Sequence, residues 1–234
     1  MNLKIFYLLF YSKMTIFKIV PLPIVKSQNQ TKFWRRAQSW YKTGKSNECE
    51  LFQRKMVENI TNKKCAKTDV RLNWDTLSLE KIKYPNKQED GFEWTEDFDG
   101  FQKIDQCHFY HNFKMICDKG GAQTRTLREV YHFVKTQADY LNKLNNFAST
   151  ILPSNNDPYI PITKNEQEDN TISLIPTNKL YFINILDGDE SHRHMNKFQY
   201  LLNKDKYVSV KDNIFVGNMD DFSKMFQSLD LDSK

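Results

Sequence analysis

One nearly unbroken apolar segment, KLYFINILDG at residues 179–188, constrains the fold more than any other part of the sequence. Only Asn184 interrupts its apolar side chains before Asp187 and Gly188 end it. A strand without alternation is typical of the centre of a sheet that is covered on both faces. We therefore expect a buried central strand and an α/β architecture, with helices on both sides of the sheet.

Helical periodicity predicts the elements that would cover this sheet. A first helix is expected within residues 46–64, with a buried stripe of Leu51, Phe52, Met56 and Ile60. A second is expected at residues 126–147, where Thr126 and Glu129 have the spacing of a capping box. Residues 63–90 have no clear period. The remaining predicted elements are a helix, a short strand and a last helix, at residues 193–203, 212–218 and 219–229.

Alternating apolar and polar residues predict two strands ahead of the second helix. In the segment GFEWTEDFDG, at residues 91–100, the alternation places Glu93, Asp97 and Asp99 on the face opposite the aromatic rings. The segment CHFYHNFKMIC follows, with Asn112 and Lys114 on one of its faces.

The two alternating segments are joined by a short polar link, residues 101–106, which favours an antiparallel hairpin. If the polar faces align, carboxylates and an ammonium group meet at one edge of the sheet. Asp99 with Asp97 or Glu93 would then offer hard oxygen ligands to a divalent metal. Lys114 would orient a metal-activated water and stabilise the attacking hydroxide. The same spacing also fits a solvated hairpin face with a surface ion pair.

An aspartate at a strand end, followed by x-x-Lys on the paired strand, resembles the signature of the PD-(D/E)XK nuclease superfamily. Here the signature is Asp99 with Asn112, Phe113 and Lys114. The order of elements is similar to that family's αβββαβ core, a central mixed sheet flanked by helices. Over residues 46–225 the chain resembles type II restriction endonucleases. The resemblance implies Mg²⁺-dependent hydrolysis of DNA that leaves a 5′-phosphate, with Asp99, Asn112 and Lys114 as the catalytic residues.

Two positions depart from the family pattern. Phe98 stands where the family has a proline, and Asn112 stands where it has an acidic residue. An amide oxygen ligates a metal but brings no charge, so a neighbouring carboxylate is expected to complete the ligand set with Asp99. The candidates are Asp97, Glu93, Glu48 and Glu50.

Polar and cationic side chains crowd the start of the second helix. A helix N-terminus favours phosphate, and Arg or Gln can read base edges. We therefore predict DNA contacts from Lys119, Gln123, Thr124, Arg125 and Arg128. The segment His192–His194 is a candidate for a second DNA-contacting loop. The alternative is an ordinary capped helix with solvated cations.

The rest of the chain divides around this core. Residues 1–45 form an expected arm, whose cations and aromatics at 31–45 suit either nucleic-acid contact or simple helix packing. Residues 152–178 are expected to be a loop insertion and 226–234 a tail. The apolar N-terminal run is too short to span a bilayer, so we expect a soluble intracellular protein without a membrane partner.

Composition and cysteine spacing limit the remaining choices. The formal charge of +5 permits a nucleic-acid partner without demanding one. Four cysteines without C-x-x-C spacing give poor support to a disulfide framework or a zinc site. The most specific hypothesis is a homodimeric type II restriction endonuclease that uses Mg²⁺, acts on double-stranded DNA and has a companion DNA methyltransferase. The alternatives are a repair or junction-resolving nuclease, and an inactive nucleic-acid-binding protein with a nuclease fold.

Overall fold

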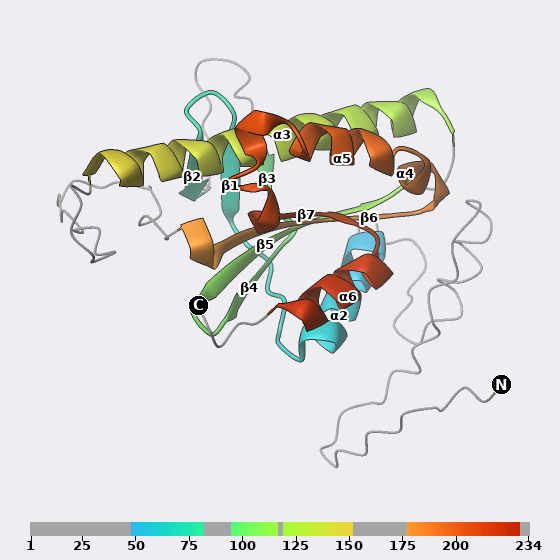
Figure 1. The fold of residues 1–234 in the computed structure, drawn as a ribbon. Helices are drawn as coiled ribbons and strands as arrows, with labels where there is room; N and C mark the ends of the chain where they lie inside the picture. Colours follow the sequence, from blue (N-terminus) through green and yellow to red (C-terminus); the bar gives the residue numbers. More distant parts are fainter. Residues whose placement is uncertain (1–47, 82–94, 117–118, 152–176, 230–234) are drawn as a thin grey trace, which may run out of the picture.

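A computed structural model describes residues 48–81, 95–116, 119–151 and 177–229, which form a mixed sheet covered by helices and a second, smaller sheet (Figure 1). The first pair of strands in the mixed sheet is antiparallel and the next two pairs are parallel. The order of its strands is β4 (Gly100–Ile104), β5 (Cys107–Met115), β6 (Leu180–Asp187) and β7 (Ile214–Gly217). The expectation of an α/β protein with a mixed sheet flanked by helices is confirmed.

Helices cover both faces of the mixed sheet. On one face lie α3 (Gly121–Ile151) and α5 (Met195–Leu202), and on the other lie α2 (Glu48–Thr61) and α6 (Met219–Ser228) (Figure 1). The apolar side chains divide accordingly into two clusters. Phe182 of β6 packs in the cluster below α3, whereas its neighbour Ile183 packs in the cluster against α2 and α6. This division explains why a strand without alternation is needed at this position.

The central strand and the C-terminal elements agree with the periodicity of the sequence. All eight residues of β6 are buried, and the strand lies between β5 and β7 as expected. The predicted last strand and last helix appear as β7 and α6. The predicted helix at 193–203 appears as α5, and a short helix that was not predicted, α4 (Asp189–Arg193), precedes it.

The hairpin differs from its prediction. The supposed link at residues 101–106 is mostly strand β4, and only Asp105 and Gln106 form the turn, with Asp105 at a φ of 53°. The supposed continuous strand over residues 91–100 is also wrong. Its described part is a short strand, β3 (Thr95–Asp97), which belongs to the other sheet.

The break between β3 and β4 coincides with a close contact at Gly100 and an inward turn of Phe98. A Cβ atom at Gly100 would lie 2.6 Å from the side-chain sulfur of Cys65, so another residue here would require that sulfur to shift. Phe98 turns into the core and packs on Phe133, with ring centroids 5.1 Å apart. The alternation is therefore reset between Asp97 and Gly100.

Two strands of the smaller sheet lie in a region where the sequence indicated no regular structure, and the third is β3. Its strand order is β2 (Ser78–Lys81), β1 (Val70–Asn73) and β3. The turn between β1 and β2 is closed by Asn73, whose side-chain oxygen accepts from the backbone N–H groups of Asp75 and Thr76. This sheet brings β3, and with it Glu96, to the edge of the larger one.

Helix α3 begins earlier than predicted. It starts at Gly121, and Thr126 lies inside it, where its hydroxyl donates to the carbonyl of Ala122. The predicted capping box of Thr126 with Glu129 is therefore wrong. No helix in the described part of the chain is long and apolar enough to cross a membrane. The predicted arm at 1–45 lies outside the described residues, as does the predicted insertion up to residue 176.

Candidate active site at the end of strand β5

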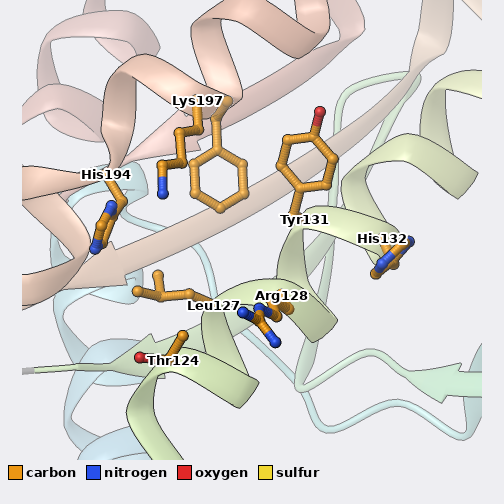
Figure 2. Close-up of a pocket in the computed structure, with 8 residues that line it drawn as sticks. Thr124, Leu127, Arg128, Tyr131, His132, His194 and Lys197 are labelled. Carbon is orange, nitrogen blue, oxygen red and sulfur yellow. The ribbon is translucent and has the colours of Figure 1, made fainter. Parts of the chain in front are cut away.

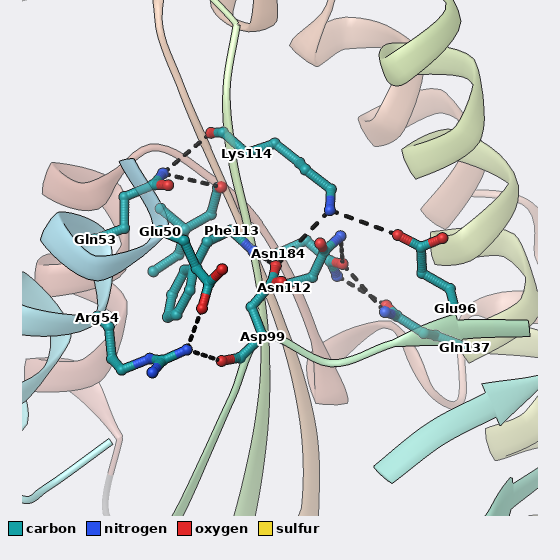
Figure 3. Close-up of polar contacts among 11 residues, drawn as sticks. Glu50, Gln53, Arg54, Glu96, Asp99, Asn112, Phe113, Lys114, Gln137 and Asn184 are labelled. Atoms are coloured by element: carbon teal, nitrogen blue, oxygen red, sulfur yellow. Dashed lines mark hydrogen bonds and ion pairs between the residues drawn. The ribbon is translucent and has the colours of Figure 1, made fainter. Parts of the chain in front are cut away.

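The ammonium group of Lys114 lies between two carboxylates. Its Nζ is 3.8 Å from Oδ2 of Asp99 and 3.5 Å from Oε1 of Glu96 (Figure 3). Lys114 is near the end of β5, Asp99 is in the bend before β4, and Glu96 is on β3. Three separate segments thus bring their charged ends together, as the hairpin prediction required of Asp99 and Lys114.

The carboxylate of Asp99 is held against β5 by the backbone. Its Oδ2 accepts a 2.7 Å hydrogen bond from the N–H of Phe113, and its own N–H donates to the carbonyl of His111 at 2.8 Å. Within the described residues, its Oδ1 has no hydrogen-bond partner, and the side chain is 22% exposed. One oxygen of Asp99 is therefore committed to the fold and the other is open to a ligand.

Asn112 is part of a buried amide network on the face of the sheet that α3 covers. The amide nitrogen of Asn184 donates to the carbonyl of Phe215, so the side-chain oxygen of Asn184 must be an acceptor. Gln137 donates to that oxygen at 3.1 Å, and Asn112 donates to it at 3.3 Å. The orientation of the Asn112 amide is fixed by this network.

The side-chain oxygen of Asn112 is consequently directed away from Asn184. It is fully buried and has no hydrogen-bond partner among the described residues. A buried carbonyl oxygen left without a partner costs about 1–3 kcal/mol. Such an oxygen is a natural ligand for a hard cation, and it lies two residues from Lys114 on the same face of β5.

Glu50 approaches the site from α2 but is paired with an arginine. Arg54 forms an ion pair with Glu50 one turn away and also donates to the backbone carbonyl of Asp99 (Figure 3). The guanidinium therefore ties the start of α2 to the bend that carries Asp99. Glu48 is also in α2.

The charges of the site nearly balance. Glu50, Glu96 and Asp99 supply three negative charges, and Arg54 and Lys114 supply two positive ones. Burial raises the pKa of Glu96, the nearby charge of Lys114 opposes this rise, and Asp99 adds to it. The net negative charge of these five side chains favours the binding of a cation between them.

The predicted metal ligands are only partly brought together. Asp97 is opposite Arg71 in the pairing of β3 with β1, and it is next to Glu96, so its side chain lies on the other face of that strand. Burial raises the pKa of Asp97, and the charge of Arg71 opposes that rise. Glu93 lies outside the described residues. Glu96 thus occupies the place beside Lys114 that the sequence interpretation gave to Asp97 and Glu93.

The sequence does not predict Glu96 at this site, because the alternation alone extends the strand to residue 100. The Asp99-Gly100 pair is a turn signal, and it indicates that the alternation ends there. The sequence does not predict Gln53 here either. Its amide donates to the carbonyl of Lys114 at 3.0 Å and to the carboxylate of Asp187 at 2.8 Å, which holds the ends of β5 and β6 against α2.

The described residues contain no group of three or more His, Cys, Asp or Glu side chains arranged to hold a metal ion. The site instead offers mixed ligands, which are Oδ1 of Asp99, the side-chain oxygen of Asn112 and the carboxylate of Glu96. Oxygen ligands of this kind suit Mg²⁺, which retains several waters and needs only one or two carboxylates. Comparison of the chain with protein-family models, curated proteins and solved structures finds no match.

The predicted DNA-contacting residues lie in the first two turns of α3 and just before it. Lys119, Thr124, Arg125 and Arg128 are exposed, and Gln123 is half-buried. Thr124 and Arg128 line a pocket together with His194, the last residue of the other predicted DNA-contacting segment (Figure 2). The structure therefore brings these two segments together, although 64 or more residues separate them in the sequence.

Proposed function

We propose that the protein is a Mg²⁺-dependent endonuclease that hydrolyses DNA phosphodiester bonds, with its active site at Asp99, Asn112 and Lys114. The observation that carries this proposal is the meeting of Lys114 with Asp99, 3.8 Å apart, beside the unpartnered buried oxygen of Asn112. A type II restriction endonuclease acting on double-stranded DNA as a homodimer is the most specific form of the proposal.

Each residue has a defined task in this proposal. Asp99 and Asn112 would hold the metal through their open oxygens, and Glu96 would supply the second carboxylate. Bound Mg²⁺ would lower the pKa of a water and stabilise the charge that develops on the phosphate. Lys114 would position that water and stabilise the hydroxide formed from it. Gln53 would act as a positioning residue, because it fixes the backbone carbonyl of Lys114.

The second candidate function is DNA binding without hydrolysis. One observation favours it, namely that the position of an acidic ligand is held by Asn112, which donates to Asn184 as part of the buried network. Arg54 also neutralises Glu50, the carboxylate that α2 brings to the site. Under this alternative the cations at the start of α3 would contact DNA while no bond is cut.

Incubation of the purified protein with a supercoiled plasmid and Mg²⁺ separates these functions. Discrete fragments would support a site-specific endonuclease, and sequencing of their ends would give the cut position and the 5′-phosphate. A smear would support a nonspecific nuclease. Retarded but uncut plasmid would support DNA binding alone, and an unbound, uncut plasmid would refute both.

Two controls make the digestion decisive. Chelation of Mg²⁺ with EDTA must stop cutting, and the Lys114→Met variant must cut far more slowly than the unmodified protein. Lys103 on β4 offers the matched variant, because it is an exposed lysine on the neighbouring strand and lies outside the site. Lys103→Met should cut as the unmodified protein does.

A further inference from the structure

A pocket of about 270 Å³ lies between α3 and the segment that contains α4 and α5 (Figure 2). Its base is apolar, because Leu127 and Phe198 are buried there. Tyr131 is half-buried beside them, with its ring centroid 5.8 Å from that of Phe198. The interior therefore presents two aromatic rings and an aliphatic side chain to any ligand.

The rim of the same pocket is cationic. Arg128 and Lys197 are exposed, they face the opening from the two helices, and the lining contains no acidic residue. Within the described part of the chain, neither of these two side chains forms an ion pair, so their charges are available to a ligand. His132 and His194 add two imidazoles. His194 is held by the buried carboxylate of Glu190 at 3.2 Å.

These features select one class of ligand. Rings inside the pocket favour a flat aromatic group, and cations at its mouth favour an anion attached to that group. Base–aromatic stacking and Arg or Lys contact with phosphate are the two contributions by which proteins bind single-stranded nucleic acid. The pocket is smaller than those that hold drug-sized ligands, which measure about 300–1,000 Å³. One nucleotide unit is therefore the appropriate size.

We propose that this pocket takes a single unpaired nucleotide, with the base against Tyr131 and the phosphate between Arg128 and Lys197. The inference deepens the proposed function. It rests on that function in one respect, which is that the nucleotide belongs to a DNA strand. A free nucleotide has the same chemistry and is the other source.

The position of the pocket fits a strand that also reaches the candidate active site. The N–H of Glu190, at the start of α4, donates to the carbonyl of Ile116, which is two residues beyond Lys114. On the other wall, Glu129 is close enough to Glu96 to raise its pKa, and it is adjacent to Arg128 in the sequence. One wall of the pocket is thus hydrogen-bonded to the end of β5, and the other carries a carboxylate near Glu96 of β3. Ligands of open α/β sheets characteristically bind beyond the carboxyl ends of the strands.

DNA that carries 2-aminopurine tests the proposal, because the emission of this base reports its stacking. Two duplexes of one sequence are titrated with protein in EDTA, so that no bond is cut. In one duplex the 2-aminopurine is unpaired, and in the other it is paired with thymine. We expect tighter binding of the first duplex and a change in its emission. In a second arm, the free 2-aminopurine deoxynucleoside 5′-monophosphate replaces the duplex.

Variants identify the pocket as the place of binding. Tyr131→Leu and Lys197→Met should each weaken binding of the unpaired duplex about tenfold. Tyr200→Leu and Lys204→Met are the matched controls. Tyr200 is on α5 and is 71% exposed, Lys204 lies two residues after α5, and neither residue lines the pocket. They should leave binding unchanged. Because Lys197 is exposed, Lys197→Met should fold normally, and a loss of binding in this variant would not be due to unfolding.

The outcomes distinguish this inference from the proposed nuclease activity. If only the monophosphate binds, and Lys197→Met weakens it, the pocket is a free-nucleotide site even where the protein cuts no DNA. If the unpaired duplex binds no better than the paired one and the monophosphate does not bind, the inference is wrong. Equal losses in the pocket variants and in the controls would also overturn it.

Discussion

Asn112 donates a hydrogen bond of 3.3 Å to the side-chain oxygen of Asn184, which also accepts from Gln137. A carboxylate at position 112 would have no proton to donate there at neutral pH. The fold therefore requires a hydrogen-bond donor at position 112, where the PD-(D/E)XK signature has an acidic residue. The orientation of the amide supplies this donor and leaves its oxygen without a hydrogen-bond partner among the described residues, where the proposed metal would bind.

Asn112→Asp should destabilise the protein in the absence of metal. The new carboxylate would be buried and would face the oxygen of Asn184, and loss of such a buried hydrogen bond costs about 1–3 kcal/mol. Urea unfolding in EDTA measures this loss. Because the carboxylate adds charge to the proposed metal site, millimolar Mg²⁺ should raise the melting temperature of the variant more than that of the unmodified protein. Asn196→Asp, on the exposed side of α5, is the control. An equal response to Mg²⁺ in all three proteins would exclude metal binding at Asn112.

Lys114→Met should reduce the rate of DNA cleavage by a factor of about 10²–10³, the usual effect of removing one stabilising group from such a site. DNA affinity should change little, because the ammonium of Lys114 is engaged by Glu96 and Asp99. Single-turnover cleavage and a gel-shift titration measure the two quantities separately. Cleavage at the unmodified rate would show that Lys114 is not catalytic.

The parts of the fold that follow from local patterns of apolar residues were predictable from the sequence. The unbroken apolar segment of β6, the helical stripe of α3 and the terminal elements β7 and α6 have local patterns that tertiary contacts do not override. The breaks were not predictable in the same way. The sequence gives no sign that Gly100 packs against the sulfur of Cys65, which is 34 residues from Asp99.

The candidate site shows the same division. The pairing of Asp99 with Lys114 follows from a hairpin and a motif, which are local. The contribution of Glu96 depends on β3 leaving one sheet for another, and that of Arg54 depends on how α2 docks. Long-range packing of this kind has no periodic signal in the sequence.

His111 should make the protein sensitive to acid. The ring is fully buried, and burial together with the charge of Arg54 lowers its pKa from the usual 6.5 to about 3. Gln102 donates through its nitrogen to Thr61 and Lys63, so its oxygen accepts from Nε2 of the imidazole at 3.1 Å. Among the described residues Nδ1 has no partner, and a proton added there would be unsatisfied.

The sign of this effect follows from proton binding. Below pH 6.5 the unfolded chain takes up a proton that the folded protein refuses, so the free energy of unfolding falls as the pH decreases towards 3. The loss should amount to about 3–5 kcal/mol over this range. In His111→Gln the pH dependence of urea unfolding should be correspondingly shallower. His108→Gln, on the other face of β5, should change it much less. Parallel pH profiles for His111→Gln and the unmodified protein would contradict the prediction.

Asp187 should have the opposite effect. Burial raises the pKa of its carboxylate from 3.8 to about 6, although the N–H of Met219 and the amide of Gln53 both donate to it. Between these pH values the folded protein holds a proton that the unfolded chain releases. Its contribution to stability is therefore present below pH 3.8 and is lost as the pH rises through 6, by about 2–3 kcal/mol.

Asp187→Asn removes this titration and is compared with the unmodified protein across the same range. As the pH rises from 4 to about 6.5, the unmodified protein should lose stability relative to the variant, because only the unmodified protein has the Asp187 carboxyl group. Asp212→Asn, at an exposed position before β7, should give a much smaller shift. A constant difference between the two proteins would mean that Asp187 is already ionised at pH 4. In that case Gln53 and Met219 would be sufficient to keep its charge stable inside the fold.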